Sequence, residues 1–202
     1  MKMIKLNLGC GQDYREGWVN ADVRLPNIYN KYNKNKIDKE INLELFPYPF
    51  KDNEFDYIYC YHVLEHIGKL NMEDFFNEIW RILKPHGTIN ISVPHFSSWN
   101  AYAFDHKRFF NIRDFISYVP ILETNQGNIK TYKLIKAKLH SRCYSHSGGK
   151  TNLKINITIE GLYNLYNKII DGLANINPIL TERFWCYWVG GFAEMNIIYE
   201  KN

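Results

Sequence analysis

The sequence predicts one α/β domain built on a mostly parallel sheet with helices on both faces. Short apolar strands alternate with helical segments along the first half of the chain. The first strand runs directly into a glycine turn, which is typical of open parallel sheets that bind ligands. The 202 residues are also enough for a single core, since folding at this length buries about 70% of the surface of the unfolded chain.

Five short strands are expected in the first half. The apolar patterns that predict them cover residues 4–8, 18–23, 37–43, 55–60 and 88–93. Between the last two, residues 62–67 should begin a helical segment, and residues 71–83 should form a helix. The second half is less regular. Residues 95–128 are aromatic and irregular, followed by a strand at 131–139, an amphipathic helix at 162–174 and a final strand at 195–200.

Composition excludes several classes of protein. Hydrophobic residues make up 46% of the chain and charged residues 23%, which excludes disordered and collagen-like chains. A net charge of +4 with dispersed lysines does not by itself indicate nucleic-acid binding. The four cysteines form no C-x-x-C pair, so we expect reduced thiols and a cytoplasmic location. We expect no transmembrane segment, because the longest uncharged apolar stretch is about half a span.

The glycine turn indicates the class of ligand. Gly9 and Gly11 let a ligand approach the backbone without a Cβ atom in the way. The third glycine of a dinucleotide site is replaced by Tyr14, and Asp13 would repel a pyrophosphate at this position. A ligand with a ribose and an amino acid part, but no phosphate, therefore fits better. The alternative for this turn is an ordinary strand end.

Polar residues end the next two strands. Asp22 stands where an acidic residue accepts hydrogen bonds from ribose hydroxyls. Asn42 ends the third strand, where it could meet the edge of a base. Either residue could instead be a solvated turn residue.

Four ordered motifs carry a family resemblance. They read LNLGCG at residues 6–11, GWVNAD at 17–22, FDYI at 55–58 with HVLEH at 62–66, and EIWRILKPHG at 78–87. Together they resemble the class I S-adenosylmethionine-dependent methyltransferases, in particular a small bacterial and archaeal branch. The resemblance covers about residues 4–115. It implies a Rossmann-like seven-stranded sheet whose last strand is antiparallel, and S-adenosylmethionine as the cofactor. Within a single domain of residues 1–202, we expect residues 95–128 and 141–190 to be insertions on the acceptor side.

The resemblance also implies a set of cofactor-binding residues. Gly9 and Gly11 would meet the methionine part, Asp22 the ribose, and Asn42 the adenine, where an aspartate is common in the family. The full expected set is Asn7, Gly9, Cys10, Gly11, Asp22, Asn42, Leu43, Tyr61 and His62. Gln12 and Asp13 depart from the family pattern, in which a glycine is frequent.

Methyl transfer mainly requires that the acceptor be aligned with the methyl group. Such alignment can lower the activation barrier by about 7–11 kcal/mol. The Asn-Pro-Pro-Tyr loop of many amine methyltransferases is absent, so we favour O-methylation of a small-molecule or glycan hydroxyl. Such an acceptor needs a base, and the candidates are His95, His106 and His66. We expect residues 95–110, with their aromatic side chains, to form an acceptor wall or lid. The alternative for each histidine is a structural hydrogen bond.

Other functions remain open. The chain could be a catalytically inactive binding module of methyltransferase fold. It could also be a tRNA methyltransferase, using the lysines at 130, 133, 136 and 138 as a basic edge. Residues 62–66 spell H-x-x-E-H, an inverted zinc-peptidase signature, but no third ligand is evident, so we expect no metal. The aromatic residues 184–188 could pack the cap, line an acceptor pocket or touch lipid.

Overall fold

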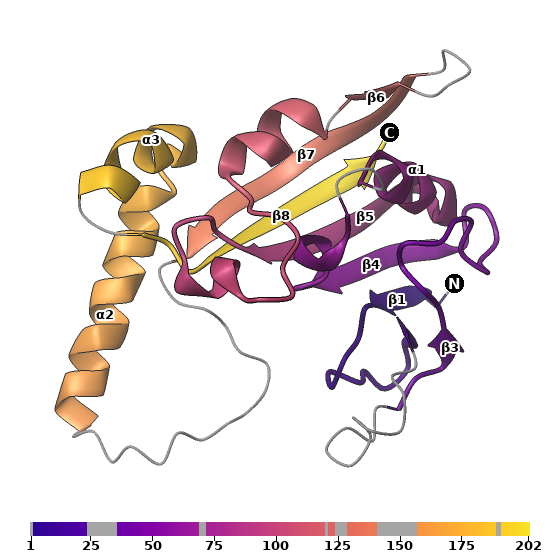
Figure 1. The fold of residues 1–202 in the computed structure, drawn as a ribbon, viewed down its shortest axis with the longest axis horizontal. Helices are drawn as coiled ribbons and strands as arrows, with labels where there is room; N and C mark the ends of the chain where they lie inside the picture. The colour runs from indigo at the N-terminus through magenta and orange to yellow at the C-terminus, as the bar shows by residue number, and fades with distance from the viewer. Residues whose placement is uncertain are drawn as a thin grey trace.

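One mixed sheet of eight strands organises the computed structural model, in the order β3-β2-β1-β4-β5-β8-β7-β6 (Figure 1). The structure describes residues 2–23, 36–68, 72–119, 121–123, 129–140, 157–188 and 191–202. The strands are β1 (Lys5–Leu8), β2 (Val19–Asp22), β3 (Lys39–Glu40), β4 (Phe55–Tyr61), β5 (Leu83–Pro94), β6 (Ile121–Glu123), β7 (Ile129–His140) and β8 (Glu194–Lys201).

The strand directions confirm the expected Rossmann-like α/β sheet. Strands β3, β2, β1, β4 and β5 pair in parallel, and the last strand, β8, is antiparallel to both β5 and β7. The short strand β6 adds an eighth member by pairing antiparallel to the start of β7. Because the parallel strands run the same way, β1, β2 and β4 end at one edge of the sheet, where a ligand site is expected.

Two of the three helices in the described residues lie where the sequence predicts helices, although their bounds differ. The three are α1 (Met72–Ile82), α2 (Ile157–Ala174) and α3 (Pro178–Trp188), with short turns η1 (Leu64–His66), η3 (Trp99–Tyr102) and the π-helical η4 (Asp114–Tyr118). Helix α1 forms as expected because Phe75, Ile79 and Ile82 recur at helical spacing and are fully buried. Acidic residues in its first turn and Arg81 in its last also complement the helix dipole.

Two expected elements are shorter in the structure, and one helix was not expected. The helical segment expected at residues 62–67 is reduced to the three residues of η1. The expected strand at 37–43 is reduced to the two residues of β3. Helix α3 was not expected, although Asn177 and Pro178 carry its start signal: the Asn177 side chain accepts a hydrogen bond from the Leu180 amide at 3.1 Å, and proline suits the first helical position.

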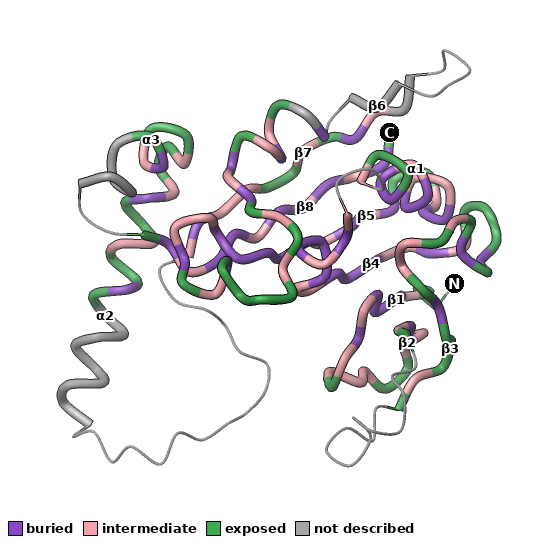
Figure 2. Tube along the Cα trace, in the orientation of Figure 1, coloured by how far each residue is buried: buried purple, intermediate pink, exposed green. Residues whose placement is uncertain are grey.

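The core lies on the central strands, which carry most of the buried residues in Figure 2. Helix α2 extends from the edge of the molecule (Figure 1). Of its described apolar side chains, Ile170 packs against the core, whereas Tyr166, Ile169 and Leu173 are each more than half exposed. Among the described residues, no helix is long and apolar enough to cross a membrane. The boundaries of the two expected insertions stay a prediction, and residues 141–156 lie outside the described residues.

Candidate functional site

A cavity of about 690 Å³ opens where β1, β2 and β4 end. Its volume is within the usual range for small-molecule sites. The predicted site residues that line it are Gly9, Gly11, Asp22, Asn42, Leu43, His62 and His66. The lining residues that the sequence analysis missed are Gln12, Val23, Glu44, Val63, Ile67, Asp105 and Lys107. The predicted residues Asn7, Cys10, Tyr61, His95 and His106 are not part of the lining.

The glycine turn needs both of its glycines, for different reasons. Gly9 has a φ of +66°, and a Cβ atom there would lie 2.3 Å from Cγ2 of Val63. Gly11 has a φ of +49°, and a Cβ atom there would meet no atom within 4 Å. Gly9 therefore allows the turn to pack against the segment after β4, whereas Gly11 leaves open space at the cavity wall.

Asp22 closes the turn and faces the cavity. Its Oδ2 accepts a hydrogen bond from the Gly11 amide at 2.6 Å, and its Oδ1 accepts one from the Val23 amide at 2.7 Å. Each carboxylate oxygen has further acceptor capacity. Asp22 can therefore order the backbone and still accept hydrogen bonds from ligand hydroxyls.

Three predicted cofactor residues support the site from behind the cavity wall. The buried Asn7 donates to the backbone oxygen of Asp13 at 2.5 Å and so holds the loop after the turn. Cys10 is also buried, and its burial together with the nearby Asp22 raises the pKa of its thiol to about 12. Tyr61 donates its hydroxyl hydrogen to Glu194 Oε2 at 3.3 Å.

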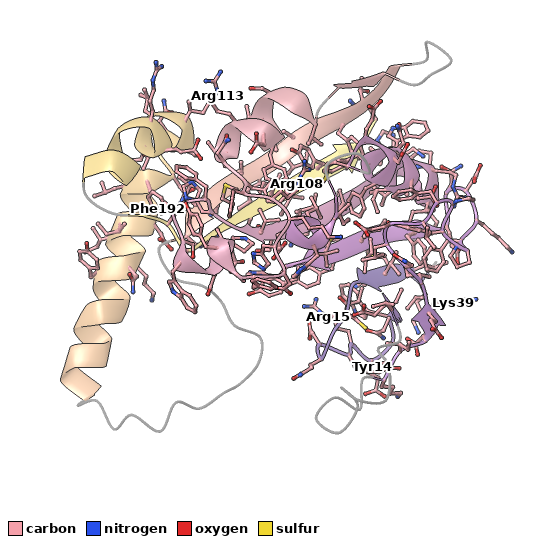
Figure 3. All side chains as sticks on the ribbon, viewed as in Figure 1. Tyr14, Arg15, Lys39, Arg108, Arg113 and Phe192 are labelled. Carbon is pink, nitrogen blue, oxygen red and sulfur yellow. The ribbon has the colours of Figure 1, made fainter. Side chains whose placement is uncertain are left out.

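The negative charge of Asp13 is compensated locally. Arg15 pairs with its carboxylate at 2.7 Å, and the Arg15 guanidinium lies 3.8 Å from the ring centroid of Tyr59. Figure 3 shows Arg15 and Tyr14 near the β1–β3 end of the molecule, far from Arg113 and Phe192 beside α3. The loop of residues 13–15, after the glycine turn, is therefore held by contacts among Asp13, Arg15 and Tyr59.

His62 and His66 do not form the paired arrangement that H-x-x-E-H requires. His62 precedes η1 and has a left-handed backbone, with a φ of +52°. Its Nδ1 lies 3.3 Å from Glu65 Oε1 and its Nε2 lies 3.7 Å from Glu194 Oε2. Because η1 is a single short turn, the two histidines do not share a helix face.

His66 instead meets His106. Their ring centroids are 4.8 Å apart and the rings are nearly perpendicular, at 86°. The Lys107 amide donates to the Glu65 backbone oxygen at 2.7 Å, which fixes the loop carrying His106 onto η1. Burial lowers the pKa of His66, with the nearby Asp105 opposing that shift. An imidazole with a lowered pKa is neutral near pH 7 and can accept a proton.

Lys107 and Glu44 form an ion pair on the cavity lining. The Lys107 ammonium lies 2.8 Å from Glu44 Oε1, which also accepts a hydrogen bond from the Gly68 amide at 2.9 Å. The hydrogen bond from Lys107 lowers the pKa of Glu44, and the amide of Gly68 acts in the same direction. The pair links the loop of residues 105–107 to the segment after β3.

The structure does not place His95 in the cavity. Its side chain is fully buried, with Nε2 2.9 Å from Glu182 Oε1 and Nδ1 2.6 Å from Ser97 Oγ. Glu182 also accepts the Ile112 amide at 2.6 Å, so His95 connects the end of β5 to α3. The expected delivery of His95 to the ligand crevice is wrong in this geometry, because the chain turns toward α3 directly after β5.

The aromatic wall expected at residues 95–110 is also different. Trp99 is 85% exposed and Tyr102 is 65% exposed, and neither lines the cavity. Asp105 and Lys107 are the residues that this segment contributes to the cavity. The sequence offered one signal for them, since both are charged and flank the predicted His106.

The comparisons with known proteins agree with this geometry. Residues 6–91 match the family model described as a methyltransferase domain. The chain is 32% identical over 103 residues to a sterol 24-C-methyltransferase of Schizosaccharomyces pombe, covering 45% of this chain and 27% of that protein. It is 36% identical over 96 residues to an uncharacterized protein of Methanocaldococcus jannaschii, covering 45% of this chain and 40% of that protein. The match therefore spans less than half the length of these relatives.

A solved structure extends the similarity beyond the motifs. A SAM-dependent methyltransferase from Archaeoglobus fulgidus superimposes with a TM-score of 0.57 at 16% identity, covering 98% of this chain and 86% of that one. At this identity the likeness concerns the fold. Residues 6–91 therefore match a methyltransferase domain, and the chain shares its fold with a SAM-dependent methyltransferase.

Proposed function

We propose that the chain is a class I S-adenosylmethionine-dependent methyltransferase that methylates a hydroxyl group of a small molecule or a glycan. The observation that carries the proposal is His66, which lines the cavity that contains the glycine turn, with the His106 ring packed against it. A hydroxyl must lose its proton as it accepts a methyl group, and a neutral imidazole near the reacting atoms can assist this.

The cavity fits the cofactor. The open space at Gly11 admits a ligand against the backbone, the carboxylate of Asp22 can accept hydrogen bonds from ribose hydroxyls, and Asn42 lines the same cavity. When bound, S-adenosylmethionine supplies a methyl carbon whose bond to the sulfonium sulfur breaks, with the electron pair kept by sulfur, as the bond to the acceptor oxygen forms. The chain's own task is to align that oxygen and receive its proton.

The acceptor proton goes to the His66–His106 pair in this proposal. His66 lines the cavity directly, and burial lowers its pKa, so the ring is neutral near pH 7. His106 lies against it from the loop of residues 105–107. The third histidine predicted as a base, His95, is enclosed by Ser97 and Glu182 and has no exposed surface.

Exposed aromatic residues support an acceptor with an apolar or ring face. Trp99, Tyr102 and Phe104 are exposed in the segment that leads to Asp105 and Lys107. Exposed apolar side chains that gather in one segment are a common feature of interaction surfaces. Sugar rings and hydrophobic small molecules both offer such a face, which agrees with a glycan or small-molecule acceptor.

The test follows a labelled methyl group. The chain is incubated with S-adenosylmethionine carrying a carbon-13 methyl, together with separate pools of metabolites, glycans and tRNA. We expect label in the metabolite or glycan pool, at a carbon chemical shift typical of an O-methyl group. Label on a nitrogen atom or in tRNA would contradict the proposed hydroxyl acceptor. Binding of S-adenosylhomocysteine with no transfer to any pool would favour an inactive binding module.

A matched pair of variants tests the histidine pair. His106→Ala should lower turnover by about 100-fold or more, with S-adenosylhomocysteine affinity within about twofold, because His106 does not line the cavity. His86→Ala is the control, since His86 is exposed and pairs with Glu200 on the strand β8. Equal turnover in the two variants would remove His106 from the mechanism.

A further inference from the structure

The geometry points to a divalent transition-metal site formed by Glu65, His66 and His106. Each residue offers one ligand atom, and these atoms lie within 4.8 Å of one another. Two come from η1 and the third from the loop that follows η3, about forty residues later in the chain. That loop is fixed onto η1 by the hydrogen bond from the Lys107 amide to the Glu65 backbone oxygen, at 2.7 Å.

Both imidazoles are oriented as metal ligands usually are. Metal-bound histidines almost always donate their second ring N–H to a carboxylate or a carbonyl. The Nδ1 atom of His66 lies 3.4 Å from the Asp105 carboxylate, and that of His106 lies 3.2 Å from the Ala101 carbonyl oxygen. When Nδ1 donates to these oxygens, the Nε2 atom of each ring carries the lone pair that a metal needs.

Glu65 supplies an independent observation. Glu65 is 1% exposed, and neither of its carboxylate oxygens accepts a hydrogen bond from another described residue. The nearest positively chargeable group is His62 Nδ1, at 3.3 Å. Buried carboxylates are normally hydrogen-bonded, paired or coordinated to a metal. A bound cation would provide the compensation that the described neighbours of Glu65 do not.

The ligand set selects the class of metal. Imidazole suits zinc, iron, cobalt and nickel, whereas magnesium and calcium prefer sites made wholly of oxygen atoms. Two histidines and one carboxylate also leave coordination positions open, as in catalytic zinc sites. His66 lines the cavity, so an open position can face it. The site differs from the H-x-x-E-H arrangement because its second histidine is His106 in place of His62, which revises the expectation that no metal binds.

The consequence for catalysis rests on the proposed function. An acceptor hydroxyl that coordinates a divalent ion has a lower pKa, and its proton can leave to water before the methyl group arrives. His66 and His106, which receive the proton in the metal-free chain, would be ligands in the metal-bound chain. The metal site itself does not depend on the identity of the acceptor.

Cobalt provides the test, with the chain stripped of metal by a chelator and free of any histidine tag. We expect one Co²⁺ per chain, with the visible absorption of a four- or five-coordinate ion. Zn²⁺ should displace it and a large excess of Mg²⁺ should not. His106→Ala and Glu65→Gln should each weaken Co²⁺ binding at least tenfold, while His86→Ala should bind as the wild type does. Thermal unfolding verifies that each variant is folded.

The outcomes separate this inference from the proposed function. If the wild type shows no coordinated Co²⁺, or His106→Ala binds it equally well, the metal site is refuted. S-adenosylhomocysteine binding and labelled-methyl transfer are measured on the same preparations. Transfer to a hydroxyl without Co²⁺ binding leaves the proposed function standing alone. Co²⁺ binding without transfer to any pool leaves the metal site standing alone.

Discussion

The two halves of the chain are stabilised in different ways. In residues 2–94, the glycine turn, Asp22 and the segment after β4 are joined by short contacts between residues close to one another in the sheet. In the second half, α3 is joined to the end of β5 by a buried cluster of His95, Glu182 and the Ile112 amide. Helix α2 leaves much of its apolar surface exposed. The glycine turn is thus held by backbone geometry and close packing, whereas α3 is held at the end of β5 through buried polar contacts.

The largest effect is expected at the glycine turn. Gly9→Ala places a Cβ atom 2.3 Å from Val63 Cγ2 in a backbone with a φ of +66°. We expect a loss of about 3–5 kcal/mol in the free energy of unfolding, from the clash and the unfavourable φ together. Urea denaturation measures it. Gly11→Ala is the control, because it also has a positive φ but no neighbour within 4 Å, and it should lose only about 1–2 kcal/mol. Equal losses would show that the packing against Val63 is unimportant.

The contact between α3 and the end of β5 should show the next largest effect. His95→Ala removes a partner of the buried Glu182 carboxylate. It should lower the free energy of unfolding by about 2–4 kcal/mol, since a buried charge is left with fewer partners. Glu182→Gln should behave similarly, and both should bind S-adenosylhomocysteine as the wild type does. A His95→Ala chain of normal stability whose turnover falls about 100-fold would restore His95 as the base.

A substitution at Asp22 tests the affinity for S-adenosylhomocysteine rather than the stability of the fold. Asp22→Asn should weaken S-adenosylhomocysteine binding by about 1–3 kcal/mol, because charge-assisted hydrogen bonds to ligand hydroxyls are lost. Calorimetry gives the affinity, and NAD should not bind to either protein. Asp52→Asn serves as the control, because Asp52 is exposed and pairs with Arg81 outside the cavity. An unchanged affinity in folded Asp22→Asn would rule out the ribose assignment.

The smallest effect is expected in α2. A Cβ atom at Gly172 would meet nothing within 4 Å, and alanine favours a helix interior over glycine by about 0.8–1.0 kcal/mol. Gly172→Ala should therefore raise the urea midpoint slightly. If α2 unfolds with the sheet, the gain appears in the same transition. A midpoint equal to that of the wild type would mean that α2 unfolds separately.

The cofactor half was predictable because its signals are local. A glycine turn directly after a strand, an acid ending the next strand and the helix at residues 72–82 depend on spacing and on the intrinsic properties of nearby residues. Gly9, Gly11, Asp22 and Asn42 accordingly line one cavity as expected. The start of α3 was also readable, from an asparagine and a proline in the usual order, although it was missed.

The sequence by itself determined the class of fold, a mostly parallel sheet whose last strand is antiparallel, and it indicated residues that line the cavity at the glycine turn. Only the tertiary structure decided the roles of the histidines, because each depends on a partner far away in the chain. His95 meets Glu182 on α3 and becomes structural, whereas His106 meets His66 because the Lys107 amide bonds to Glu65. Spacing within one element does not encode such pairings, since they arise when loops from different strands converge at one edge of the sheet.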